Sequence, residues 1–307
     1  RVNSSNLGAP MTRNRLLEET TASVALFLDD DVVPASHVVK EYLSAMLSGP
    51  ARRACGLVGS VIFPKSVDVW HEATRMSGIT MAFDWPEGVF PQAHVPWGVT
   101  ASLCVWRKFA ATFGAEFAKT GGGEDVDFCL QVTHNSGLPW KKESVAAVYH
   151  PFWPRLPDAA GIVKYLQHFF AWTQGDGLLL DAYPQHVYVN LPNVVELSLP
   201  VVLLLGASAF VWLWAVELAL EAHNALVGPH ARHLCWTDRM CAAILSGIVK
   251  NVVDAGHLFY FVRRGRVNMC CRRFDWFCGV TDDVKRGERR KFAIRWALWL
   301  LSLACLV

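Results

Sequence analysis

The chain has 307 residues and a formal net charge of +2 at pH 7, so its overall charge gives no general attraction to nucleic acid. Hydrophobic residues make up 52% of the sequence, which is high for a soluble protein, and they gather after about residue 197. The nine cysteines lack the spacings of a zinc site or of a disulfide framework. The sequence does not begin with Met and stops inside an apolar run, so we expect it to be a piece of a longer protein.

Three consecutive aspartates, Asp29, Asp30 and Asp31, follow the apolar run Val24 to Leu28. This run has the composition and length of a buried strand, and Pro34 closes it. Carboxylates this close together repel one another unless a cation lies among them. A divalent ion with oxygen ligands is the simplest neutraliser, and it leaves positions for phosphate oxygens. The sequence therefore predicts a strand-end metal site for a phosphorylated substrate, with a solvated Asp-rich turn as the alternative.

Helix-like and strand-like patterns alternate from residue 1 to about 160, which favours an α/β layered domain. We expect helices over 35–48 and 124–133, strands over 55–63 and 145–149, and an extended stretch from Trp97 to Arg107. Gly49 and Pro50 should end the first helix. The spacing in that helix predicts one apolar face, made of Val38, Val39, Tyr42, Leu43, Met46 and Leu47.

Two further segments of this part carry groups suited to an anionic substrate or a proton transfer. Near the start, a glycine in Asn6-Leu7-Gly8 precedes Arg13, and a guanidinium matches phosphate geometry; a plain surface loop is the alternative. Farther along, the glycines 121–123 allow close backbone approach to a ligand, and Glu124 and Asp125 follow them. One of these acids could take a proton from an incoming hydroxyl, or both could simply complement the start of a helix.

A histidine, His150, directly follows the expected strand 145–149. Its imidazole could ligate a metal or donate to a phosphate. The alternative is a packed or exposed side chain without such a role.

In this order, the segments resemble the family 2 glycosyltransferases with a GT-A fold. The match rests on an N-x-G-x-x-x-x-R-N motif that begins at Asn6, on the hydrophobic run before the three aspartates, and on the GGEDxDF motif of Gly122 to Phe128. The stretch from Trp97 to Ser102 is similar to the glycine-bearing segment that these enzymes place before the acceptor helix. The resemblance covers roughly residues 3 to 160, and the family's first strand, with its contacts to the donor base, would precede residue 1.

The resemblance implies a GT-A-like mixed sheet flanked by helices and followed by membrane helices. It implies inverting, metal-dependent transfer of a sugar from a nucleotide-diphosphate sugar to an acceptor hydroxyl, with Mn²⁺ or Mg²⁺ as cofactor and a glycan or a lipid as possible acceptor. The alternatives are a non-catalytic membrane scaffold, a hydrolase with two carboxylates, and a processive polysaccharide synthase. Processive members carry a Gln-x-x-Arg-Trp element, and the nearest segment here, Gln167 to Trp172, lacks the arginine.

The resemblance also implies roles for individual residues. It makes Asp125 the catalytic base and lets Glu124 help to hold the acceptor. The implied donor-binding residues are Asp29, Asp30, Arg13 and Gly98. The implied metal ligands are Asp31, Asp29 and His150. The implied acceptor-binding residues are Gly122, Gly123, Asp127 and Trp153.

The C-terminal part changes in character, so we expect a catalytic domain over 1–160, an interfacial segment over 161–195 and a membrane region over 196–307. Ile162 to Thr173 is an aromatic-rich amphipathic segment that could lie on a membrane or dock on the domain. After it, Gly175-Asp176-Gly177 predicts a turn. The expected membrane spans are Leu197–Val216, which is uncharged and could instead be a buried core helix, Cys241–Val262 and Phe292–Val307.

The segment from Arg263 to Lys291 carries ten Lys and Arg residues, and by the positive-inside tendency it should face the cytoplasm. The loop between the first two expected spans has far fewer, chiefly Arg232 and Arg239. If the two earlier spans cross the membrane, the catalytic domain lies on this same, cytosolic side. We therefore expect an integral membrane protein with a cytosolic catalytic domain.

Overall fold

The computed structural model describes residues 6–48, 53–66, 68–85, 90, 94–153, 158–227, 233–280 and 282–304. The chain divides into two units, which we describe separately. The first comprises 1–65, 81–153 and 276–280, and the second comprises 66–80, 154–275 and 281–307. The predicted helix stop at Gly49 and Pro50, the loop residue Arg232 and the last predicted residues, 305–307, lie outside the described residues.

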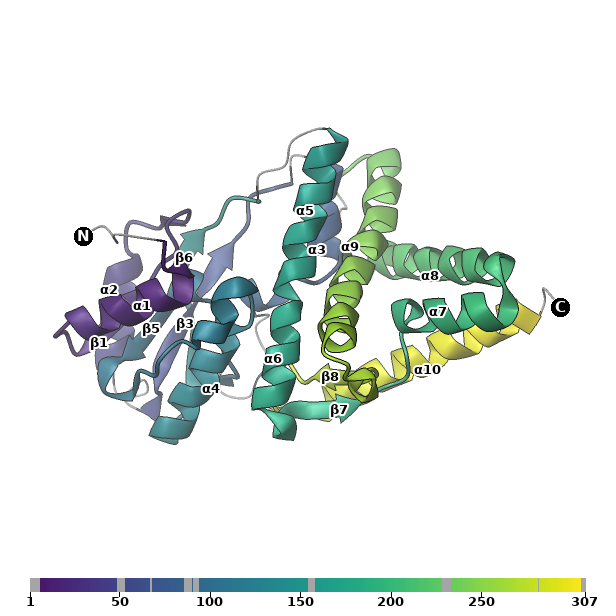
Figure 1. The fold of residues 1–307 in the computed structure, drawn as a ribbon. Coiled ribbons are helices and arrows are strands. Elements are labelled where there is room, and N and C mark those ends of the chain that lie inside the picture. The colour runs from purple at the N-terminus through teal and green to yellow at the C-terminus, as the bar shows by residue number, and fades with distance from the viewer. Residues whose placement is uncertain are drawn as a thin grey trace. The chain divides into compact units, whose positions relative to one another are not determined.

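The first unit is an α/β unit built on a mixed sheet, as the alternating patterns predict (Figure 1). Its strand order is β1-β5-β3-β6-β2, with β4 also paired to β6; β3 and β6 are parallel and the other pairs are antiparallel. The strands are β1 Val24–Phe27, β2 Val33–Pro34, β3 Gly56–Ile62, β4 His94–Val95, β5 Leu103–Trp106 and β6 Trp140–Tyr149. The helices are α1 Gly8–Glu19, α2 Val38–Leu47 and α4 Glu124–Ser136, with short 3₁₀ turns at η2 Met81–Phe83, η4 Thr100–Ser102, η5 Arg107–Phe109 and η6 Ala115–Lys119.

Two helices cover opposite faces of the sheet. Successive residues of a strand point to opposite faces, and in β3 these are Val58 and Gly59. Gly98 packs on Val58, and its carbonyl accepts from the Cys129 thiol of α4. On the other face, a Cβ added to Gly59 would meet the Tyr42 hydroxyl of α2. The sheet is thus held between α4 and α2.

Two predictions of burial were only partly right. The strand β1 is half-buried rather than buried, because it lies at the edge of the sheet and pairs with β5 alone. In α2, Val38, Tyr42 and Met46 are buried, but the other half of the predicted apolar face is exposed: Val39, Leu43 and Leu47. A helix that packs on a sheet along one line buries residues of one narrow stripe, and these three side chains lie beside it.

A buried asparagine fixes α1 to the rest of the first unit. The Asn14 amide donates to the Phe113 carbonyl at 2.9 Å and accepts from the Phe113 N–H at 2.7 Å. Because both backbone groups would lose their partner, Asn14→Ala is expected to lower the free energy of unfolding by about 2–4 kcal/mol. Chemical denaturation followed by tryptophan fluorescence checks this. Arg15→Ala is the control, since that side chain is 42% exposed and forms an ion pair with Glu19 one turn later, so its loss should change stability by less than about 0.5 kcal/mol.

The second unit is helical apart from one short strand pair. Its helices are α3 Val69–Met76, α5 Ala159–Trp172, α6 Gln174–Ala182, α7 Val194–Leu205, α8 Ala207–Val227, α9 Trp236–Arg263 and α10 Asp282–Ala304, with 3₁₀ turns at η7 Pro184–His186 and η8 Val267–Met269. The strands β7 Val187–Val189 and β8 Arg272–Phe274 pair antiparallel. The long helix α9 packs against α3, α5, α6 and α8 (Figure 1).

The predicted turn at Gly175-Asp176-Gly177 is wrong, because these residues lie within α6. Gly177 allows close helix packing and does not reverse the chain, and Gly256 of α9 has a similar role. A Cβ at Gly177 would collide with the Tyr260 ring of α9, and one at Gly256 of α9 would collide with the backbone of Phe170 in α5. Both contacts let α9 approach its neighbours more closely than any larger residue would allow.

The amphipathic segment Ile162–Thr173 forms most of α5. Its buried residues include Tyr165 and Phe169, and the Tyr165 hydroxyl hydrogen-bonds Thr74 of α3 at 2.8 Å. This face is therefore covered by protein. The opposite side of the helix includes Val163, which is 53% exposed.

The first expected membrane span, Leu197–Val216, is divided in two. The helix α7 begins at a capping box of Asn193 and Glu196 and ends at Gly206, whose φ of +87° is outside the range of an α-helix. With 12 residues, α7 is about 18 Å long, short of the roughly 30 Å hydrocarbon core. The helix α8 starts one residue later. The single uncharged run in the sequence therefore corresponds to two helices, with a change of chain direction at Gly206.

Two described helices, α8 and α9, are long and apolar enough to cross a membrane by length and composition. The second expected span, Cys241–Val262, lies within α9. The third, Phe292–Val307, is not among the candidate spans of the described residues. Its described part continues a helix that begins ten residues earlier, at Asp282, in a charged segment.

Candidate functional site

The aspartates and the histidine meet because of the strand directions. The strands β1 and β3 are both antiparallel to β5, and β3 is parallel to β6. The C-terminal ends of β1, β3 and β6 therefore all lie on the same side of the sheet. Asp29 follows β1, and His150 follows β6. The short strand β2 brings the chain back along β6, with Val33 opposite Tyr149, and this register places Asp31 beside His150.

Asp29, Asp31 and His150 form a group that could hold a metal ion. One ligand atom from each lies within 4.8 Å of the others. The His150 Nε2 is 3.7 Å from the Asp31 carboxylate, and its Nδ1 faces the Pro151 carbonyl, which can only accept. In the neutral imidazole the proton is therefore on Nδ1, and the Nε2 lone pair is directed toward the carboxylate side.

The chemistry of this donor set suits a divalent ion. Two carboxylates and one imidazole supply one oxygen-rich side of a coordination sphere, and the imidazole favours a transition ion such as Mn²⁺ over Mg²⁺. The His150 side chain is buried, whereas the Asp31 side chain is 52% exposed, so the group is open to solvent on the aspartate side. The third aspartate, Asp30, is exposed and belongs to neither this group nor the next one.

Arg13 of α1 connects this group to the acids at the start of α4. Its Nη2 donates to Asp29 at 2.9 Å, and its Nη1 donates to Glu124 at 3.3 Å and lies 4.0 Å from Asp125. The guanidinium also stands over the Phe113 ring at 5.5 Å. Burial lowers the pKa of Arg13, but the charges of Asp125, Asp29 and Glu124 outweigh it and raise the pKa above the ordinary value.

Aromatic packing positions these charges. The Phe113 ring stacks on Phe128 of α4 at 4.2 Å, and both rings meet Phe27 at the end of β1 edge to face. The same cluster therefore holds the end of β1, the start of α4 and the ring beneath Arg13. The left-handed backbone of Gly123, with φ +91°, then starts α4 and sets Glu124 and Asp125 in its first turn.

Asp125 has the electrostatic properties of a proton acceptor. The pKa of Asp125 is raised to about 8, mainly by burial and also by the charges of Glu124 and Asp29, while Arg13 and a hydrogen bond from the Thr100 hydroxyl oppose the rise. Its side chain is 21% exposed, yet the Oδ1 atom is buried and has no hydrogen-bond partner among the described residues. A carboxyl group can take a proton from a hydroxyl when its pKa lies near neutral pH and one of its oxygens accepts no other hydrogen bond.

The remaining predicted residues lie around these two groups in different ways. Gly98 is buried, and a Cβ there would collide with Val58, so close packing on β3 requires glycine at this position. Asp127 is also buried and accepts from Gln131 one turn later at 2.8 Å. Gly122 precedes the helix start, where its carbonyl accepts from Thr120.

The last of them, Trp153, joins an aromatic cluster around His150. Its ring lies 5.6 Å from the imidazole, 5.6 Å from Phe63 and 6.0 Å from Phe83. The cluster fixes the imidazole next to Asp31. The sequence did not reveal Phe63 and Phe83, since isolated phenylalanines carry no signal of the partner they will meet.

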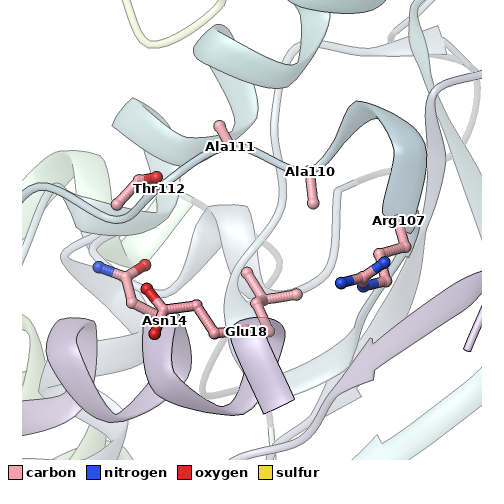
Figure 2. Close-up of a pocket in the computed structure, with 7 residues that line it drawn as sticks. Asn14, Glu18, Arg107, Ala110, Ala111 and Thr112 are labelled. Carbon is pink, nitrogen blue, oxygen red and sulfur yellow. The ribbon is translucent and has the colours of Figure 1, made fainter. Parts of the chain in front are cut away.

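A separate pocket of about 290 Å³ lies beside α1 (Figure 2). Its lining includes Asn14, Glu18 and Arg107, with small side chains from the segment after β5 (Figure 2). It contains none of the predicted site residues, and its one acid and one base come from segments about 90 residues apart. We assign no function to it.

Comparisons with known proteins add no further constraint on the site. No protein-family model matches the chain. No match was found among curated proteins.

Proposed function

We propose that the protein is a membrane-anchored, metal-dependent glycosyltransferase of the inverting type with a GT-A-like catalytic unit. It would transfer a sugar from a nucleotide-diphosphate sugar to the hydroxyl of a glycan or lipid acceptor. One observation carries the proposal: Asp29 belongs to the three-residue group with Asp31 and His150 and is also joined through Arg13 to Glu124 and Asp125.

The two acid groups suit the two requirements of sugar transfer. Asp29, Asp31 and His150 would hold Mn²⁺ or Mg²⁺. When bound, such a cation stabilises the charge that grows on the leaving diphosphate and orients the donor. Asp125 would take the proton of the acceptor hydroxyl as the hydroxyl attacks the sugar from the face opposite the diphosphate.

The other residues would bind and orient the substrates around these groups. Arg13 lies between the donor side and the acid pair, so its guanidinium could contact a donor phosphate while it keeps Asp125 partly ionised. Asp30 and Gly98 remain proposed donor contacts. Gly122, Gly123, Asp127 and Trp153 remain proposed acceptor contacts, and holding both substrates in line would supply much of the rate.

The length and apolar composition of α8 and α9 support the proposed membrane placement. If both cross the bilayer, the first unit and the basic segment after α9 lie on the same side, and the positive-inside tendency puts that side in the cytosol. Nucleotide-activated sugars would then reach the site directly. Protease protection of the first unit in sealed vesicles tests this orientation.

A non-catalytic scaffold is the second candidate, and the position of Arg13 favours it. A guanidinium already lies among Asp29, Glu124 and Asp125, so part of the acid cluster is neutralised without a metal ion. A scaffold of this kind need not bind a nucleotide sugar. Incubation of the full chain with a panel of nucleotide sugars and Mn²⁺, with and without acceptors, separates the candidates. A new glycoside that disappears on chelation supports the transferase, free sugar indicates a hydrolase, and the absence of any metal-dependent donor binding supports the scaffold.

The metal group makes its own prediction. Asp31→Asn removes one of the two carboxylates and is expected to weaken Mn²⁺ binding at least about tenfold, measured by isothermal titration calorimetry in the presence of a bound nucleotide sugar. Glu116→Gln is the matched control, because it removes the same charge from an exposed residue outside both acid groups. Equal weakening by both changes would indicate a diffuse charge effect and would remove the proposed ligand set.

A further inference from the structure

The structure points to a second binding surface, at one end of the helical unit and independent of sugar transfer. We propose that the last turn of α9 and the first half of α10 bind the headgroups of anionic phospholipids. The end of α9, the strands β7 and β8 and the start of α10 gather on one side of this unit (Figure 1). The segment from Arg263 to Lys291, which runs from the end of α9 through β8 into α10, has ten Lys and Arg residues against four Asp and Glu residues.

Direct contacts connect these elements. His257 of α9 faces the Arg272 carbonyl of β8 at 3.1 Å, and β8 pairs with β7, where Tyr188 lies opposite Arg273. The Arg289 guanidinium of α10 lies over the Tyr188 ring at 5.8 Å. The two helix ends therefore lie on one continuous surface of this unit.

Both helices change from apolar to basic at this end. In α9, Phe259 and Val262 are 43% and 52% exposed, and Arg263 and Arg264 follow them directly. In α10 the order is reversed: Arg289 and Arg290 are exposed, and the exposed residues that follow are apolar, namely Ile294, Leu298 and Leu301. Exposed apolar surface that gives way to arginine on two neighbouring helices is the pattern of a membrane–water boundary.

Charge complementarity selects anionic lipid among possible partners. Several basic residues here are already paired, such as Arg266 with Asp181, Arg273 with Glu196 and Lys291 with Glu288. Within the described part of the chain, Arg263, Arg264, Arg289 and Arg290 have no acidic partner at ion-pair distance. Arg264 instead lies over the Tyr260 ring at 3.8 Å, which holds its guanidinium in place. Four unneutralised guanidiniums beside an apolar boundary match a negatively charged headgroup layer.

The test uses the full chain in a neutral detergent, titrated with soluble phosphatidylserine that carries six-carbon acyl chains. Binding followed by microscale thermophoresis is expected to be at least about tenfold tighter than to phosphatidylcholine with the same chains and to weaken as salt rises. Inorganic phosphate is titrated in parallel, and equally tight binding of phosphate would overturn the assignment to lipid. Equal affinity for the two lipids would also overturn it.

Two charge-matched variants test which residues bind. Arg289→Gln/Arg290→Gln removes two unpaired arginines and is expected to weaken phosphatidylserine binding about tenfold or more. Arg266→Gln/Lys291→Gln removes the same charge from paired residues and is expected to weaken it less than about threefold. Equal losses would mean that only net charge matters and would refute the assigned surface. Thermal melting of each variant in the same detergent confirms that the fold is retained.

Discussion

Replacing Asp125 with asparagine is expected to lower kcat/KM for sugar transfer by a factor of about 10²–10⁴, because the amide cannot accept the proton of the acceptor hydroxyl. The geometry around the residue should survive, since asparagine has the same shape and the buried Oδ1 accepts no hydrogen bond from a described residue. Rates with the matched acceptor and Mn²⁺ are the measurement. Glu116→Gln, which neutralises an exposed acid of η6 outside both acid groups, should keep nearly full activity.

The pH dependence follows from the raised pKa of Asp125. Because the proposed base must be ionised, kcat/KM is expected to rise with pH through a midpoint near 8 and to level off above it. The midpoint should be lower if a bound cation near Asp29 adds its charge. Arg13 lowers the pKa of Asp125, so Arg13→Gln should move the midpoint to higher pH, whereas Arg15→Gln on the exposed side of the same helix should not. An unchanged pH profile in the Arg13 variant would show that Arg13 does not influence the pKa of Asp125.

The stability of the fold should also depend on the ionisation of Asp125, but it should fall as pH rises, whereas activity increases. The folded pKa of Asp125 lies above its ordinary value of 3.8, so the folded state binds the proton more tightly than the unfolded chain. This carboxyl therefore opposes folding increasingly as pH rises from about 4 to about 8. The Asp125→Asn protein should gain melting temperature relative to the wild type across that window. A variant that loses both activity and melting temperature would indicate a structural role instead.

The family resemblance implied that the aspartates and His150 lie together, and short-range patterns located the two strand ends that carry them. An apolar run that ends in carboxylates marks a strand end, and His150 marks another. Once both strands run in the same direction within one sheet, their C-terminal ends lie on the same side of it, and the return strand β2 beside β6 then brings the aspartates to His150. The directions of β1 and β6, with the short strand β2 between them along the chain, satisfy this condition.

The role of Arg13 could not be predicted in the same way. Its contacts with Asp29 and Glu124 require that α1 pack against η6 and that Phe113 support the guanidinium, which are long-range events. The same holds for Thr100, whose hydroxyl reaches Asp125 across 25 residues of chain. Periodicity reports the face that a residue occupies, and it carries no information about a partner far away in the sequence.

The errors in the helical unit have a common physical origin. The run from 197 to 216 lacks charge, and hydropathy alone cannot show that Gly206 breaks it. Gly177 looks like a turn residue, but its small size is used for contact with the Tyr260 ring of α9. In both cases glycine has two structural uses, close packing and positive φ, and tertiary contacts decide between them.

The second large effect is expected from Arg295→Met, which should lower the free energy of unfolding by about 3–5 kcal/mol. Arg295 is 9% exposed in α10, and its Nη1 lies 2.7 Å from Glu217 and 2.6 Å from Glu221, both buried residues of α8. Lys250 of α9 binds Glu221 at 2.6 Å, so the network joins three helices. Without the guanidinium, Glu217 is left as a buried carboxylate with no other ion-pair partner among the described residues. Thermal and chemical denaturation in detergent are the measurements.

Two comparisons separate this effect from simple loss of a side chain. Lys291→Met, one turn earlier on α10, removes a lysine that is 72% exposed and, among the described residues, forms an ion pair with Glu288 alone. It should change stability by less than about 0.5 kcal/mol. Glu217→Gln added to Arg295→Met should restore part of the lost stability, because the uncompensated charge disappears with it. If the two changes instead add to a larger loss, the buried ion pair contributes through packing, and the charge network is not what holds α8 and α10 together.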